Sequence, residues 1–97
     1  MSLAAAGPRA LRLNPRDNVA VAVRPLAEGD ILDIAPDAVP IAEDIPVGHK
    51  VALSAIPAGG AIVKYGEIVG RATAAIERGR HVHVHNVVSS RLPGVTR

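Results

Sequence analysis

The chain of 97 residues contains no cysteine. Disulfide bonds, thiolate metal sites and a cysteine nucleophile are therefore excluded, while the redox compartment stays open. Any metal ion that the chain binds must be held by histidine, by carboxylates or by oxygen atoms of a substrate.

Aromatic residues and long apolar runs are also scarce. Phe and Trp are absent, and Tyr65 is the one tyrosine. Proteins that bind single-stranded nucleic acid stack bases on aromatic rings, so we expect no nucleic-acid partner in spite of a pI near 9.7. No apolar run approaches the roughly 20 residues that span a bilayer, and the opening ten residues lack the basic start of a secretory signal. We therefore expect a cytoplasmic protein with no membrane partner.

Small aliphatic residues must form the core. The chain is 48% hydrophobic and has eight prolines and nine glycines, a composition typical of many turns and few long elements. Apolar and polar residues alternate in four short runs, at 18–24, 50–56, 61–66 and 80–88. These runs predict a mainly β domain of short, bent strands. The stretch 69–79 has some helical propensity, which Gly70 and Gly79 limit to one or two turns.

One phrase recurs four times. It reads "LAEGDIL" at 26–32, "IPVGHKV" at 45–51, "IPAGGAI" at 56–62 and "IERGRHV" at 76–82. In each copy an aliphatic residue precedes a tight turn, a glycine ends the turn, and a strand follows at once. The pattern predicts a positive φ at these glycines, which are Gly29, Gly48, Gly59 and Gly79. The spacing is too irregular for a solenoid, so we interpret the copies as corners of one domain at 10–90, with loose tails at 1–9 and 91–97.

Charge is unevenly distributed along the chain. Residues 1–24 contain four arginines and one aspartate (+3), and residues 25–48 contain six acidic and no basic residues (−6). Residues 49–97 contain seven basic and two acidic residues (+5). A basic C-terminal half that also holds the histidines suits a small anionic ligand.

Histidine and valine alternate within "GRHVHVHN" at 79–86. If 80–88 is one strand, the histidines (His81, His83 and His85) share a face and the valines (Val82 and Val84) enter the core. Neighbouring positions on one face lie roughly 6.5 Å apart, so two adjacent imidazoles can share a metal ion, whereas the outer two lie about 13 Å apart. We expect His83 and His85 to be the pair. The alternative is a solvent-facing strand whose histidines bind nothing.

Other polar side chains have open roles. His49 directly follows a turn glycine, and the sequence does not show whether it comes near the other histidines. Lys64 and Tyr65 stand at a strand end, where they could hold a carboxylate or polarise a hydroxyl; the alternative is a solvated lysine and a half-buried tyrosine. Asn86 could contact a ligand or cap a turn, and Asp17 is first a turn residue.

The order of these segments resembles a known family. "DNVAVAV" (17–23), "IPVGHKVAL" (45–53), "VKYGEIVGRA" (63–72) and "HVHVHN" (81–86) are similar to the N-terminal domain of altronate and galactarate dehydratases. A similar unit is the separate small subunit of two-chain lyases such as sulfolactate sulfo-lyase. The resemblance covers residues 12–87 and implies a SAF domain with the β-clip fold of type III antifreeze proteins.

The resemblance also implies a function. Enzymes of this family remove water from sugar acids, or sulfite from sulfolactate, with a divalent ion, typically Fe²⁺, with Mn²⁺ as the alternative. Most of their active site lies on a much larger domain. We therefore expect a small subunit that is inactive alone, with a large dehydratase subunit and an anionic sugar acid as partners. Exposed strand edges could also pair between copies of the chain and form a homo-oligomer.

Matching the family motifs assigns roles to individual residues. The assigned roles are catalysis for His49, His83, Lys64 and Tyr65, substrate binding for Lys50 and Asn86, and metal binding for His83 and His85. His81 precedes the H-x-H-N core of the motif and receives no role. Two other interpretations remain: a non-catalytic SAF module that binds a sugar acid or regulates a partner, and a structural β domain whose histidines bind nothing.

Overall fold

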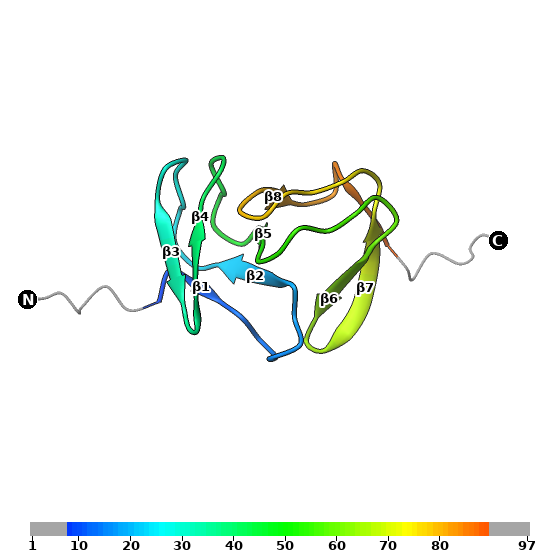
Figure 1. The fold of residues 1–97 in the computed structure, drawn as a ribbon, viewed down its shortest axis with the longest axis horizontal. Helices are drawn as coiled ribbons and strands as arrows, with labels where there is room; N and C mark the ends of the chain where they lie inside the picture. The colour runs from blue at the N-terminus through cyan, green and yellow to red at the C-terminus, as the bar shows by residue number, and fades with distance from the viewer. Residues whose placement is uncertain (1–7, 90–97) are drawn as a thin grey trace, which may run out of the picture.

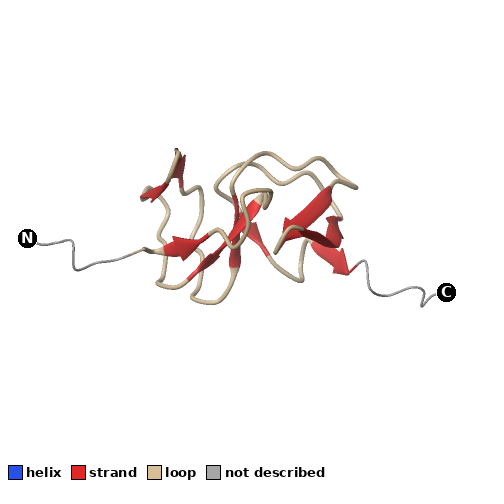
Figure 2. Cartoon of the chain, turned by 90° about the horizontal axis from the view of Figure 1, so that it is seen from below, coloured by secondary structure: helices blue, strands red, loops and turns tan. Residues whose placement is uncertain are grey.

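Strands and loops make up the whole of the described chain. The structure, a computed structural model, describes residues 8–89, in which there are nine strands and no helix (Figure 2). The strands are β1 (Ala10–Leu11), β2 (Val19–Ala22), β3 (Ile31–Ile34), β4 (Asp37–Pro40), β5 (Lys50–Ala52), β6 (Ala61–Lys64), β7 (Glu67–Ala72), β8 (His81–Val82) and β9 (Val87–Ser89). The mainly β prediction is confirmed. Residues 8–89 accordingly include no helix long and apolar enough to cross a membrane.

The helical turns predicted within 69–79 are wrong. The first part of this stretch belongs to β7, which pairs with β6 on one side and β9 on the other. Its later part forms an isolated bridge between Ile76 and Ile56. Strand pairing on both sides therefore outweighs the weak local preference for helix.

Antiparallel pairing organises the strands into three small sheets. The strand order is β1-β2-β5-β8 in the largest sheet, β6-β7-β9 in the second and β3-β4 in a hairpin. Figure 1 shows the β3–β4 hairpin at one end of the molecule, the β6–β7 hairpin at the other, and β2, β5 and β8 between them. The middle sheet therefore separates two outer hairpins.

The four recurring phrases form the corners that lead into and out of these hairpins. Their glycines have φ values of 94° (Gly29), 87° (Gly48), 80° (Gly59) and 85° (Gly79), which confirms the predicted turns. Their first aliphatic residues pair in two bridges, Leu26 with Ile45 and Ile56 with Ile76. Each bridge has two reciprocal backbone hydrogen bonds of 2.8 to 3.0 Å.

The pairing shows that the corners alternate, so that the first matches the third and the second matches the fourth. We call residues 19–52 the first repeat and residues 50–82 the second repeat. The amide of Gly48 donates to the carbonyl of Ala22 in the first repeat, and that of Gly79 donates to Ala52 in the second. Strand β5 ends the first repeat and begins the second, which explains the irregular spacing in sequence.

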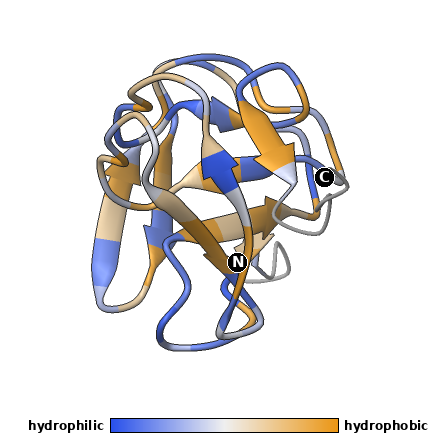
Figure 3. Cartoon of the chain, turned by 90° about the vertical axis from the view of Figure 1, so that its right-hand side faces the viewer, coloured by the Kyte–Doolittle hydropathy of each residue, from blue (hydrophilic) through white to orange (hydrophobic). Residues whose placement is uncertain are grey.

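Each repeat has its own aliphatic core. The first core includes Leu26, Leu32, Val39 and Ile45, and the second includes Ile56, Ile62, Ile76 and Val82, all at most 4% exposed. Hydrophobic and hydrophilic residues follow one another along the short strands (Figure 3). Burying one face of each strand in this way stabilises the fold without aromatic side chains.

A buried carboxylate fixes the β6–β7 hairpin. Asp17 is 5% exposed, and its two carboxylate oxygens accept hydrogen bonds from the amides of Tyr65 (3.0 Å) and Gly66 (2.8 Å). Both amides belong to a hairpin turn with positive φ, 58° at Tyr65 and 75° at Gly66. The side chain of Asn18 adds bonds to Ala61 and Val63 on β6. The Asp17 amide also closes a local turn by donating to the Asn14 carbonyl (2.9 Å), whereas the hairpin turn that its side chain holds lies 48 residues further along the chain.

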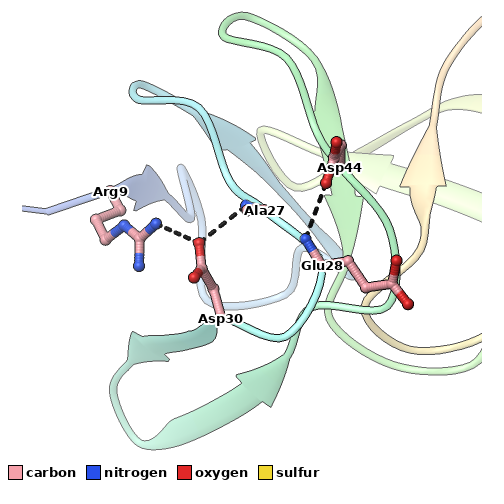
Figure 4. A network of polar contacts seen from close by, with 5 residues as sticks. All are labelled: Arg9, Ala27, Glu28, Asp30 and Asp44. Carbon is pink, nitrogen blue, oxygen red and sulfur yellow. Dashed lines mark hydrogen bonds and ion pairs between the residues drawn. The ribbon is translucent and has the colours of Figure 1, made fainter.

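A second carboxylate organises the first corner. Asp30 accepts hydrogen bonds from the guanidinium of Arg9 (2.6 Å) and from the amide of Ala27 (2.9 Å), and the neighbouring Glu28 amide donates to Asp44 (Figure 4). The Ala27 amide first, and Arg9 second, lower the pKa of Asp30. Of the predicted tails, residues 1–7 and 91–97 lie outside the described residues.

Candidate metal centre and adjoining basic pocket

Three histidines from two strand ends meet in one cluster. His49 follows Gly48 and precedes β5, His81 begins β8, and His83 follows the end of β8. Because β5 and β8 pair side by side, the corner that ends the first repeat lies beside the corner that ends the second. We call His49, His81 and His83 the histidine cluster.

The imidazoles of the cluster are close and nearly parallel. His49 Nδ1 lies 2.7 Å from His81 Nε2, so one ring donates a hydrogen bond to the other. The ring centroids of His49 and His83 are 3.7 Å apart at an interplanar angle of 17°. One ligand nitrogen from each of the three residues lies within 4.8 Å of the other two. The three residues are half-buried.

The predicted strand over 80–88 is wrong. Strand β8 ends at Val82, residues 83–86 form a turn, and β9 begins at Val87. Val84, which the alternation placed in the core, is 81% exposed. His85 is also exposed and lies outside the histidine cluster, with its ring centroid 5.0 Å from that of His81. The structure therefore groups His83 with His49 and His81 rather than with His85.

Asn86 causes the break in the strand. Its side-chain oxygen accepts a hydrogen bond from the His83 amide (2.9 Å), and its side-chain nitrogen donates to the His81 carbonyl (2.8 Å). Its own amide donates to the His83 carbonyl at 3.1 Å. These are the turn-capping contacts that the sequence offered as the alternative to ligand binding, and they fix the backbone of two cluster histidines.

Burial and mutual repulsion favour neutral imidazoles. Burial lowers the pKa of His81 most, followed by the charges of His85, His49 and His83, against a smaller opposite effect of the Glu43 carboxylate. Burial also lowers the pKa of His83, with further contributions from His49, Lys50 and His85. A neutral imidazole offers the lone pair that a metal ion needs.

The cluster fits a divalent metal ion. Two nitrogens bound to one tetrahedral ion at about 2.1 Å lie about 3.4 Å apart. His49 and His81, now 2.7 Å apart, would have to separate, and the stacked rings would have to rotate so that their nitrogens point to one ion. His83 Nδ1 is buried and has no hydrogen-bond partner in residues 8–89. A buried polar atom without a partner is costly and often marks a ligand site. The three histidines could therefore hold an ion, with further ligands from a substrate or a second chain.

A basic pocket adjoins the cluster at His83. It has a volume of about 250 Å³, and Lys50 from β5 and Lys64 from β6 line it together with His83. Burial first, and the charge of Lys64 second, lower the pKa of Lys50. Tyr65 is 64% exposed and is not among the lining residues, although its ring centroid is 5.4 Å from the Lys64 ammonium.

His81 is the cluster residue that the sequence left without a role. Its register opposite Val51, two positions after His49, brings it into the cluster. The recurring phrase carries that signal, because it predicts strands directly after Gly48 and Gly79. The sequence did not show that these two strands pair.

Comparison with known proteins relates the chain to dehydratases and to a sulfo-lyase. The family described as altronate/galactarate dehydratase SAF domain matches residues 8–90. Altronate dehydratase of Escherichia coli is 42% identical over 76 residues, which are 78% of this chain and 15% of that protein. Galactarate dehydratase (L-threo-forming) of Escherichia coli is 41% identical over 85 residues, which are 86% of this chain and 16% of that protein.

A shorter relative matches over most of its own length. The alpha subunit of (2R)-sulfolactate sulfo-lyase from Paracoccus pantotrophus is 50% identical over 48 residues, which are 50% of this chain and 72% of that subunit. By contrast, the chain spans only about a sixth of the length of the dehydratases.

Proposed function

Since the chain belongs to the altronate/galactarate dehydratase SAF domain family, we propose that it is the small, histidine-bearing component of a sugar-acid hydro-lyase whose large component is a separate subunit. The observation that carries the proposal is the histidine cluster beside a basic pocket. A family of lyases supplies the reaction class, and the cluster supplies a place for a metal ion in this chain.

The metal ion of the proposal is Fe²⁺, with Mn²⁺ as the alternative, held by His49, His81 and His83. An ion held there would supply Lewis-acid stabilisation of the negative charge that develops when the proton next to the substrate carboxylate is removed. His49 and His83 then contribute to catalysis as ligands. This assignment differs from the sequence prediction of His83 with His85, since His85 lies outside the cluster.

The reaction needs a group that accepts a proton from carbon and a proton for the departing oxygen. The C–H bond next to the carboxylate breaks and its proton goes to a base. The electron pair forms a C=C bond while the C–O bond of the neighbouring carbon breaks, and the departing oxygen takes up a proton and leaves as water. His85 is an exposed imidazole beside the cluster, so we assign it the proton transfer.

The lysines and Tyr65 bind the substrate in this proposal. Lys50 and Lys64 line one pocket, where their ammonium groups pair with anionic oxygens of the acid. Tyr65 stands exposed at the tip of the β6–β7 hairpin, so its phenol reaches a substrate only if a partner subunit covers the tip. Asn86 acts by positioning His81 and His83.

A second candidate is the small subunit of a sulfolactate sulfo-lyase. The 50% identity over 72% of such a subunit favours it. The same site would serve, because only the leaving group differs: sulfite departs in place of water.

The test is reconstitution with a large dehydratase subunit. The purified complex, loaded with Fe²⁺ or Mn²⁺, is assayed on altronate, galactarate and sulfolactate with and without this chain. Turnover that requires the chain and is lost in both His83→Ala and His85→Ala, with His83→Ala alone losing metal, supports the proposal. A complex that forms but whose turnover is independent of this chain contradicts it and favours a non-catalytic module.

A further inference from the structure

In the described part of the chain, the basic pocket beside the histidine cluster presents two positive charges and no counter-charge. Its lining includes Lys50 and Lys64 but no carboxylate, and its remaining walls are His83, three valines and a serine. In the ion pairs of residues 8–89 the positively charged partner is always an arginine, namely Arg9, Arg12 or Arg80.

Among the described residues, neither lysine has a partner that carries a negative charge or accepts a hydrogen bond from its ammonium group. Within residues 8–89, no ion pair or side-chain hydrogen bond reaches Lys50 or Lys64; the one contact is the Tyr65 ring near Lys64. Both lysines are half-buried. Two like charges that face one small pocket repel each other, and an anion between them removes the repulsion.

The pocket is continuous with the cluster through one residue. His83 stacks on His49 at a centroid distance of 3.7 Å and also lines the pocket. An acid whose reacting end lies at the histidine cluster therefore extends its other end toward the two lysines. An acid with a single carboxylate would place it at the cluster and leave both ammonium groups unpaired.

We propose that this pocket selects acids with two anionic groups, and that Lys50 and Lys64 bind the anionic group that does not lie at the histidine cluster. The substrate class is a hydroxy acid dianion, whose second group is a carboxylate or a sulfonate. This inference rests on the proposed function for its reaction but not for its binding site.

Binding to the metal-free chain tests the pocket by itself. The ¹⁵N-labelled chain is titrated in EDTA with three acids of the same carbon number: glycerate (one charge), tartronate (two carboxylates) and 3-sulfolactate (carboxylate and sulfonate). We expect saturable NMR shifts at Lys50, Lys64 and His83, with at least one dianion bound about tenfold or more tightly than glycerate. The better of the two dianions identifies the second group.

Charge-matched variants separate the pocket from the net charge of the chain. Lys50→Gln/Lys64→Gln should remove the preference for dianions. The control Arg16→Gln/Arg24→Gln removes two exposed charges elsewhere and should keep it. Equal affinity for glycerate and both dianions, or an equal loss in both double variants, would overturn the inference.

The outcome is distinguishable from failure of the proposed function. If the dianions bind as expected and the reconstituted complex has no lyase activity, the pocket stands and the hydro-lyase proposal fails. If the complex turns over altronate, a monoanion, as efficiently as galactarate and the chain shows no preference for dianions, the hydro-lyase proposal stands and this inference fails.

Discussion

At the corner after Ile45 the chain continues as Gly48 and His49, and at the matching corner after Ile76 it continues as Gly79 and Arg80. The backbone at the two corners is nearly the same: the amide of His49 donates to Pro46, that of Arg80 donates to Glu77, and both bonds are 3.1 Å long. The side chains have nothing in common. His49 belongs to the histidine cluster, where its ring contacts His81, whereas Arg80 pairs with Glu77 in an exposed ion pair.

The same division holds for the outer hairpins. A buried carboxylate, Asp17, holds the β6–β7 tip, while the β3–β4 tip is held at an exposed position by Arg12, which donates to the Ala35 carbonyl. The repeated backbone therefore provides the scaffold, and the positions where the repeats differ provide the candidate site. Variants that break the scaffold should affect folding, and variants that make the repeats alike should affect binding.

The largest loss of stability is expected at Gly79, whose surroundings differ from those of the matching Gly48. A Cβ at Gly79 would collide with the Pro40 carbonyl oxygen, while a Cβ at Gly48 would meet nothing within 4 Å. Both residues have positive φ. Gly48→Ala should therefore lower the free energy of unfolding by about 1 to 2 kcal/mol from backbone strain alone, and Gly79→Ala by more than about 3 kcal/mol. Urea denaturation measures both, and equal losses would contradict the described packing of Gly79.

The next effect concerns the residue after those glycines. His49→Arg gives the first corner the residue of the second, so we expect the fold to persist and the affinity for Co²⁺ to fall at least about 100-fold, because a ligand is lost. Isothermal titration measures the affinity and circular dichroism the fold. His85→Ala is the matched control and should bind Co²⁺ as the unmodified chain does. A fall in His85→Ala with none in His49→Arg would restore the sequence-based pair.

The contacts that hold the two hairpin tips should also differ in how much they stabilise the fold. Asp17→Ala leaves the Tyr65 and Gly66 amides without their acceptor, and we expect it to lower the free energy of unfolding by about 2 to 3 kcal/mol. Arg12→Ala, at the other tip, should cost less than about 1 kcal/mol because its contacts are exposed. Thermal denaturation of the two variants compares them directly, and a larger loss in Arg12→Ala would contradict a stabilising role of the Asp17 hydrogen bonds.

The smallest effect is a pH dependence at one corner. Asp30 in the first repeat matches Gly60 in the second, and hydrogen bonds from Ala27 and Arg9 lower the pKa of Asp30. A carboxyl whose pKa is lower in the folded state stabilises the fold above its unfolded pKa, near 4, and loses that contribution as the pH falls through the folded value.

A pair of variants isolates this contribution. Asp30→Asn should flatten the acid side of the curve of unfolding free energy against pH. Asp33→Asn, which removes an exposed carboxylate of β3, controls for the loss of one negative charge. Identical curves for Asp30→Asn and the unmodified chain would show that the Asp30 contacts do not contribute.

Local features of the sequence were sufficient for the turns and insufficient for the site. The spacing of aliphatic residues around Gly29, Gly48, Gly59 and Gly79 predicted the positive φ angles, because that geometry depends on a few consecutive residues. The alternation at 80–88 predicted a continuous strand, and it failed because Asn86 bonds back to His81 and His83. The alternation of histidine and valine does not show whether the Asn86 side chain will bond to the backbone and end the strand.

The composition of the cluster depends on contacts between distant residues. His49 reaches His81 across 32 positions, through the pairing of β5 with β8. No periodicity within either segment specifies that pairing. The basic pocket is similar, since Lys50 and Lys64 come from strands of different sheets. Sequence reasoning identified these lysines as candidates but could not show that they share a pocket.

In the proposed metal centre of this chain, His49, His81 and His83 are the ligands. Long-range ¹H–¹⁵N NMR spectra of the full chain, recorded during titration with Zn²⁺, observe every imidazole nitrogen separately. We expect large shifts of one ring nitrogen in each of these three residues and little change in His85. Shifts confined to His83 and His85, or no saturable shift in any histidine, would contradict it.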